Sequence, residues 1–298
     1  MPRPASISAT VIAAGTMTAC GPGAATVVAE KGGWARFPAN SEAAVAASLF
    51  LDEAAIEVDV FLTNDRMPVL VDGPRLDRAT CRTLDGERIP EDVWLIQHDL
   101  ADLDAGYRCG VAADPAWPDA RVGAAPVHTL DALTAQLAED PPDAVLLDLR
   151  WTPNVSHAPE VFAAEVLERW WRDQPSTRLR VVADRAAMIE AVESRARSAG
   201  VEVVTLLRWP TEPPRGSASG ARLATTLASD AGAADPWAAM AAAGADGLLV
   251  HGDLLRRADV ARRPAGAELG LQGADTAHPA ADWLEQGDWV LDATGGVD

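Results

Sequence analysis

The segment Ile56-Glu57-Val58-Asp59-Val60 decides how this chain folds. Side chains of a strand alternate between its two faces, so Glu57 and Asp59 share one face and the apolar residues share the other. Two carboxylates inside a parallel barrel are tolerated near the C-terminal end of a strand, where a cation can lie between them. The alternative is a half-exposed edge strand, because acidic residues at period two also occur on open strands.

Apolar runs like this one recur along the chain, with helical stretches between them. They are Ala25–Ala29, Ala55–Leu62, Ala144–Leu149, Leu179–Ala183, Glu202–Leu207, Asp246–Val250, Glu268–Leu271 and Asp288–Leu291. The helical stretches are Ser41–Leu51, Leu130–Leu137, Pro159–Arg172, Arg185–Ala199, Pro236–Ala243 and Ala280–Gln286, while Arg222–Ala228 fits either a strand or a short helix. Eight strands alternating with helices predict a (β/α)₈ barrel, the TIM-barrel fold, over residues 25–298.

Two connections between these runs are unusually long. The first covers about residues 64–143 and holds an extended run at Pro68–Val71, two cysteines and a proline-rich stretch. Loops beyond about 15 residues are usually functional or carry their own structure, so we expect a small insertion after the second barrel strand. The second, Arg208–Gly220, is rich in Pro, Gly and Ser and is predicted to be a surface loop.

The charge of the chain excludes some partners. The 298 residues include 25 Lys+Arg and 44 Asp+Glu, a formal net charge of −19. Such an acidic surface repels nucleic acid and anionic membranes. Apolar residues make up 48% of the chain, enough for a large core rather than a disordered chain.

The first twenty residues resemble an export signal. Arg3 precedes a mildly apolar, uncharged run, and Met17-Thr18-Ala19-Cys20 resembles a bacterial lipoprotein cleavage box with Cys20 as the lipidated residue. This interpretation predicts an exported lipoprotein of the cell envelope, held to the membrane only through its lipid anchor. The alternatives are a frayed N-terminal tail and a cytoplasmic location. No other stretch approaches the length needed to cross a bilayer.

Cys81 and Cys109 then remain as an even pair. They are compatible with one disulfide in an oxidising compartment, and equally with two unrelated buried thiols.

The side chain of a third carboxylate is predicted in the same way, from the alternation of faces along a strand. Leu147-Asp148-Leu149-Arg150 places Asp148 and Arg150 on one face of the next barrel strand. Together with Glu57 and Asp59, Asp148 would form an oxygen-only cluster, which suits Mg²⁺ or Ca²⁺ rather than zinc. Arg150 could hold an anionic group beside that cluster.

A series of ordered motifs resembles the glycerophosphodiester phosphodiesterase family. That family has His-Arg-Gly, Pro-Glu-Asn-Thr, Glu-x-Asp-Val, Thr-x-Asp, His-Asp, Leu-x-Arg-x-Thr and Glu-x-Lys in this order. This chain has Glu30-Lys31-Gly32, Pro38-Ala39-Asn40-Ser41, Glu57-Val58-Asp59-Val60, Thr63-Asn64-Asp65, Val71-Asp72, Leu76-Asp77-Arg78-Ala79-Thr80 and Asp148-Leu149-Arg150. The resemblance implies a TIM barrel, a divalent metal and a small-molecule phosphodiester ligand.

The departures from the family concern its chemistry. The two family histidines that act as acid and base correspond to Glu30 and Val71. Valine cannot transfer a proton, and a glutamate adds negative charge near the metal ligands. A carboxylate pair of Glu30 and Asp72 is conceivable as a substitute. Lys31, the only lysine, could pair with Glu30 or hold an anion, or it could be a solvated loop residue.

The remaining candidates lie near the predicted mouth of the barrel. Trp34 and Trp151 each follow a barrel strand and could form a wall for a ligand, with Asp72 and Arg150 beside them. Four histidines (His98, His128, His157 and His278) lie in segments with no catalytic spacing, and His251, which ends a strand, is interpreted as structural.

Three functions remain open. The first is a catalytically impaired, metal-retaining barrel that binds a ligand at the cell envelope. The second is a working metal-dependent phosphodiesterase, or a lyase-type relative, with substituted acid–base groups. The third is a structural envelope lipoprotein in which the metal site is idle.

Overall fold

The structure is a computed structural model that describes residues 26–51, 54–115, 117–173, 177–209, 235–251, 261–272 and 288–292. Several predictions fall outside these residues: the N-terminal segment with Cys20, most of the loop after Arg208, the ambiguous segment Arg222–Ala228, His278 and the helix predicted over Ala280–Gln286. Within the described ranges, no helix has both the length and the apolar character that spanning a bilayer requires.

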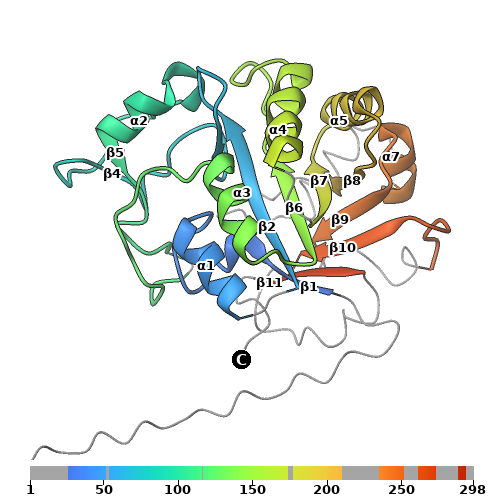
Figure 1. Ribbon diagram of the computed structural model, residues 1–298, viewed down its shortest axis with the longest axis horizontal. Coiled ribbons are helices and arrows are strands. Elements are labelled where there is room, and N and C mark those ends of the chain that lie inside the picture. The colour runs from blue at the N-terminus through green and yellow to red at the C-terminus, as the bar shows by residue number, and fades with distance from the viewer. Residues whose placement is uncertain are drawn as a thin grey trace, which may run out of the picture.

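Eight parallel strands form a closed barrel (Figure 1). They are β1 (Thr26–Ala29), β2 (Ala55–Leu62), β6 (Ala144–Leu149), β7 (Arg178–Ala183), β8 (Val204–Trp209), β9 (Gly247–His251), β10 (Glu268–Gln272) and β11 (Trp289–Asp292). The barrel closes because β1 pairs with β11 on one side and with β2 on the other. The predicted (β/α)₈ barrel is therefore confirmed.

Helices pack around the outside of this barrel, as Figure 1 shows for α3, α4, α5 and α7. The described helices on the barrel are α1 (Glu42–Phe50), α3 (Leu130–Glu139), α4 (Pro159–Asp173), α5 (Ala186–Ala199) and α7 (Pro236–Ala243). Two of them begin at hydroxyl caps, where Ser41 accepts from the Ala44 N–H and Thr129 accepts from the Ala132 N–H, both at 3.1 Å. Such caps satisfy backbone donors that a helix leaves unpaired.

The chain between β2 and α3 builds additional structure at one side of the barrel (Figure 1). β3 (Pro68–Leu70) pairs antiparallel with β2. It is followed by β4 (Arg82–Thr83), the short helices η2 (Leu95–Gln97) and α2 (Leu100–Gly106), and β5 (Tyr107–Arg108), which pairs with β4.

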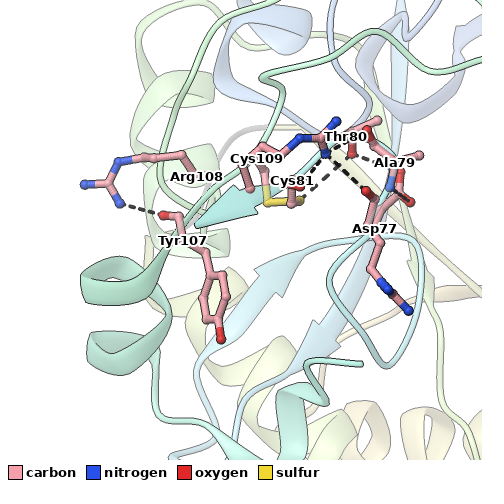
Figure 2. The surroundings of a disulfide bond; sticks show 9 residues. Asp77, Ala79, Thr80, Cys81, Tyr107, Arg108 and Cys109 are labelled. Atoms are coloured by element: carbon pink, nitrogen blue, oxygen red, sulfur yellow. Dashed lines mark hydrogen bonds between the residues drawn. A yellow bond between two sulfur atoms is a disulfide. The ribbon is translucent and has the colours of Figure 1, made fainter. Parts of the chain in front are cut away.

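A disulfide between Cys81 and Cys109 joins the two arms of this insertion. Figure 2 shows the loop of Asp77 and Thr80 on one side of the bond and the β5 segment on the other. The Val111 N–H also donates to the Thr80 carbonyl at 3.0 Å, so the two arms are held together on both sides of the bond.

The barrel interior is layered along its axis. Near the N-terminal ends of the strands, Arg180 binds both carboxylate oxygens of Glu268 at 2.8 Å and stacks on the ring of Trp289. An apolar layer follows, contributed by alternate residues of the strands: Val28, Ala55, Ala144, Leu146, Val182, Leu206, Leu249 and Leu291. The next inward positions are polar, and they form the mouth of the barrel.

One predicted boundary is wrong, and it changes the composition of the mouth. The surface loop was predicted to begin at Arg208, but β8 continues to Trp209, and Arg208 is buried. The strand continues because Leu206 and Arg208 share the inward face, with Leu206 in the apolar layer and Arg208 in the polar one.

Candidate metal centre and adjoining cavity

Three buried carboxylates meet at the mouth of the barrel. Asp59 on β2 lies directly beside Asp148 on β6 in the strand register, and Glu57 precedes Asp59 on the same face. Glu57, Asp59 and Asp148 each offer an oxygen, and these oxygens lie within 4.8 Å of one another. The structure thus brings together the three residues that the sequence nominated as metal ligands.

In each carboxylate, one oxygen accepts a hydrogen bond from a described residue and the other accepts none. Glu57 Oε2 accepts from the Lys31 N–H at 2.8 Å, and Asp59 Oδ2 accepts from Asn40 Nδ2 at 2.9 Å. Asp148 Oδ2 accepts from Arg150 Nη1 at 2.9 Å. Asp59 Oδ1 is buried and has no hydrogen-bond partner among the described residues. Hydrogen bonds that fix one oxygen of a carboxylate are expected of groups that support metal ligands.

Unusual backbone conformations place two of these donors. Lys31 and Asn40 have φ values of +49° and +58°. Asparagine tolerates this left-handed region better than most residues, and lysine is an outlier there. The Asn40 N–H donates to the Lys31 carbonyl at 2.9 Å, and the Asp59 N–H donates to Asn40 Oδ1 at 3.0 Å. The loop before α1 is thereby fixed directly against β2 at Asp59.

Three cationic side chains surround the carboxylates. Lys31 Nζ lies 2.6 Å from Asp72 Oδ2 and 3.8 Å from Asp59 Oδ2. Arg150 contacts Asp148, approaches Asp72 Oδ1 to 3.1 Å and lies 3.6 Å from Asp59 Oδ1. Arg208 Nη2 lies 2.5 Å from Asp148 Oδ2 and 3.8 Å from Glu57 Oε1. Lys31 is buried, so it is not the solvated loop lysine that the sequence left open.

The carboxylates remain strained electrostatically despite these cations. Burial, followed by the neighbouring charge of Asp72, raises the pKa of Asp59 to about 8. Burial, and then the charges of Asp59 and Asp148, raises the pKa of Glu57 well above its usual value. A divalent cation would favour the ionised forms. The oxygen-only donor set, with an Asp59 oxygen that accepts no hydrogen bond from the described residues, therefore fits Mg²⁺ or Ca²⁺.

The two positions that the sequence resemblance aligns with the family histidines are Glu30 and Val71. Glu30 is buried, and its Oε1 accepts from Gln272 Nε2 at 2.5 Å. Val71 is half-buried and packs against the core. Of the histidine side chains that the structure describes, none is bonded to the three carboxylates: His157 Nε2 lies 2.8 Å from the Thr63 carbonyl, for example.

A cavity of about 460 Å³ adjoins the cluster, between the mouth and the insertion. Lys31, Asp72 and Arg150 line its inner end, and the disulfide cysteines line its outer wall. The Trp34 indole forms an apolar wall, with Lys31 Nζ 5.0 Å from its ring centre and Trp117 in edge contact at 5.9 Å. Trp151 does not line this cavity, and its indole N–H donates to the His157 carbonyl at 2.9 Å.

Sequence reasoning assigned no role to three residues of the site. Asn40 lies in one of the motifs that resemble the family, but the sequence did not predict its hydrogen bonds to Asp59. Arg208 was assigned to a loop, and Gln272 lay one residue beyond a predicted strand. The structure connects the latter two, because Arg208 Nη1 donates to Gln272 Oε1 at 2.5 Å.

Solved structures with the same barrel include proteins described as glycerophosphodiester phosphodiesterases. A protein from Silicibacter pomeroyi, assigned as a glycerophosphoryl diester phosphodiesterase, superposes with a TM-score of 0.72 at 19% identity, covering 93% of this chain and 92% of its own. A phosphodiesterase from Oleispira antarctica, in complex with its product sn-glycerol-3-phosphate, gives 0.64 at 17% identity, with 91% and 94% covered. A glycerophosphodiester phosphodiesterase from Agrobacterium tumefaciens gives 0.56 at 18% identity, with 92% and 100% covered.

Comparison by sequence adds nothing to this likeness. No protein-family model matches the chain, and no curated protein matches it. The structural likeness extends over nearly the whole chain. The chain therefore has the barrel fold of the solved glycerophosphodiester phosphodiesterases.

Proposed function

We propose that this chain is a divergent glycerophosphodiester phosphodiesterase-like protein that binds a small phosphodiester over a divalent cation and hydrolyses it slowly or not at all. One observation carries the proposal: Glu57, Asp59 and Asp148 converge within 4.8 Å beside a cavity whose inner end holds Lys31 and Arg150. A neighbour of the same fold is solved with the product sn-glycerol-3-phosphate, a phosphate monoester that shares its phosphate group with the proposed ligand.

The residues at the inner end of the cavity suit a phosphate group. A cation held by the three carboxylates would supply positive charge to polarise a phosphoryl oxygen. Lys31 and Arg150 would neutralise the remaining charge, with Arg150 offering a planar pair of donors. The alcohol portions of the diester would lie along the Trp34 wall, where apolar and stacking contacts are available.

The impairment follows from the two positions without histidine. The Val71 side chain has no group that exchanges protons, and the Glu30 carboxylate is tied to Gln272 in the barrel interior. Loss of one positioned acid or base typically costs about 10²–10⁴-fold in rate. With both histidines replaced, binding should persist while turnover falls.

A working phosphodiesterase remains the second candidate, because one histidine does lie near the cavity. His128 lines the cavity wall, and its backbone carbonyl accepts from the Leu70 N–H beside Val71. Burial lowers the pKa of His128, which keeps its imidazole neutral and able to accept a proton. Its ring nitrogens are buried and have no hydrogen-bond partner among the residues that the structure describes, so it would have to turn toward the ligand.

We expect Asp72→Asn to strengthen the binding of anions. Asp72 places its two oxygens against Lys31 and Arg150, at the position that we assign to the phosphate. Neutralising it removes a negative charge and should lower the dissociation constant of inorganic phosphate several-fold. Phosphate titration by calorimetry would measure this change. Asp92→Asn, on the outer cavity wall beside Arg75, is the matched control and should leave binding nearly unchanged. Weaker phosphate binding by Asp72→Asn would show that this carboxylate does not compete with the ligand.

The proposed location is the cell envelope. The lipoprotein-like box at Cys20 motivates this proposal, and the Cys81–Cys109 disulfide supports it because disulfides persist in oxidising compartments. Globomycin treatment of expressing cells, which blocks lipoprotein processing, should cause the precursor to accumulate. Unchanged migration and a cytoplasmic location would contradict the proposal.

The proposed function is tested by titrating the purified chain with sn-glycerol-3-phosphate by calorimetry, in Mg²⁺, in Ca²⁺ and in EDTA. We expect binding that depends on the metal and is lost in Asp59→Asn. Glu268→Gln changes a carboxylate at the opposite end of the same barrel, so it should bind like the wild type if it folds. No heat from either metal or ligand would favour the third candidate, a structural protein with an idle site.

A further inference from the structure

Arg208 lies in the interior of the barrel rather than in the ligand cavity. It is 5% exposed and does not line the cavity. Its two terminal nitrogens divide between two sides of the barrel. Nη2 contacts Asp148 Oδ2 at 2.5 Å, and Nη1 contacts Gln272 Oε1 at 2.5 Å.

These contacts connect Asp148, Glu57 and Glu30, three of the acidic groups of the inner mouth. Nη2 also lies 3.8 Å from Glu57 Oε1, one of the oxygens that the protein leaves without a hydrogen bond. On the other side, Gln272 Nε2 donates a hydrogen bond to Glu30 Oε1. One guanidinium thus reaches two of the three metal-ligand carboxylates and, through an amide, the buried glutamate beside them.

A fixed cation at this place has two opposing consequences. Buried carboxylates are costly without a positive partner, so Arg208 stabilises Glu57 and Asp148 when no metal is bound. The same charge repels a divalent cation that enters between those carboxylates, and the repulsion is strong because Arg208 and both carboxylates are buried. The arginine should therefore stabilise the barrel and weaken metal binding.

We propose that Arg208 is a built-in counter-ion of the carboxylate cluster, which lets the barrel fold without metal and lowers the affinity of the site for divalent cations. This inference rests on the proposed metal site of the preceding section. It predicts that metal dependence of folding appears when the arginine loses its charge.

The test compares Arg208→Gln with the wild type by thermal unfolding in EDTA and in Mg²⁺ or Ca²⁺, together with metal titration by calorimetry. We expect the variant to melt at a lower temperature in EDTA, to recover most of that loss in metal, and to bind metal at least tenfold more tightly than the wild type. Equal or weaker metal affinity in the variant would overturn the proposal.

Arg180→Gln is the matched control. Arg180 is a second buried arginine of the barrel interior, but it binds Glu268 at the opposite end. Its loss should lower the melting temperature equally in EDTA and in metal. If metal rescues both variants alike, the effect is not specific to the cluster, and the proposal is wrong.

Two further experiments cover the cases in which the first variant does not fold or the ligand does not bind. If Arg208→Gln does not fold even in metal, Arg208→Lys is used, since a lysine cannot span both Asp148 and Gln272. Its melting temperature should rise more in metal than that of the wild type, and an equal rise would overturn the proposal. Titration of wild type with sn-glycerol-3-phosphate separates this inference from the proposed function, because ligand binding can fail while the metal gain of Arg208→Gln persists.

Discussion

Replacing Glu30 and Val71 together by histidine is expected to raise glycerophosphodiester hydrolysis by about 10²-fold or more over the wild-type chain, since each positioned acid or base typically contributes about 10²–10⁴-fold. The carboxylate cluster and the cavity are present. Val71 lines the cavity, and Glu30 is buried next to Lys31, whose backbone N–H binds Glu57. The measurement is release of free alcohol from glycerophosphocholine at saturating Mg²⁺ or Ca²⁺.

The single substitutions are the internal controls. Glu30→His alone and Val71→His alone should each remain close to the wild type, because an acid and a base are both needed. Asp59→Asn added to the double variant should abolish the gain. A double variant that binds metal and ligand yet turns over no faster than the wild type would show that the two positions are not what limits the chemistry.

Removing the disulfide is expected to destabilise the chain by about 2–4 kcal/mol, the usual contribution of such a cross-link. Cys81 and Cys109 close a sequence separation of 28 residues and line the cavity. The substitution Cys81→Ser with Cys109→Ser should therefore lower the urea midpoint and also weaken ligand binding. Urea unfolding and calorimetric titration of the same preparations would measure both effects.

Reduction of the wild-type protein provides an independent check. Dithiothreitol should shift the wild-type urea midpoint toward that of the double serine variant and leave the variant itself unchanged. If the double serine variant keeps wild-type stability and affinity, the two arms of the insertion are held by their other contacts, and the disulfide has no part in shaping the cavity.

The barrel could be predicted from sequence because its signal is repeated and strong. Each barrel strand is a short apolar run in the sequence. The period-two alternation within Glu57-Val58-Asp59 identifies which residues share a face. The carboxylate cluster follows from the same alternation, since Glu57, Asp59 and Asp148 are inward positions of two neighbouring strands. Local pattern was enough for these features.

The cationic side of the site could not be predicted in the same way. Arg208 precedes a proline and a Gly- and Ser-rich stretch, which local composition interprets as loop, while its burial depends on partners from β6 and β10. The hold of Asn40 on Asp59 depends on a left-handed turn, and the bond between Gln272 and Glu30 joins residues 242 positions apart. Contacts across the barrel of this kind are set by the closed sheet rather than by neighbouring residues.

The most direct test of the account is ³¹P NMR of glycerophosphocholine with the wild-type chain in Mg²⁺ or Ca²⁺. One spectrum reports both binding and cleavage of the diester. We predict a diester resonance that shifts or broadens with protein, returns to its free position in EDTA and in Asp59→Asn, and keeps its intensity for hours. Rapid conversion of the diester to glycerol phosphate, abolished in Asp59→Asn, would contradict impaired chemistry, and an unperturbed resonance would contradict a phosphodiester site.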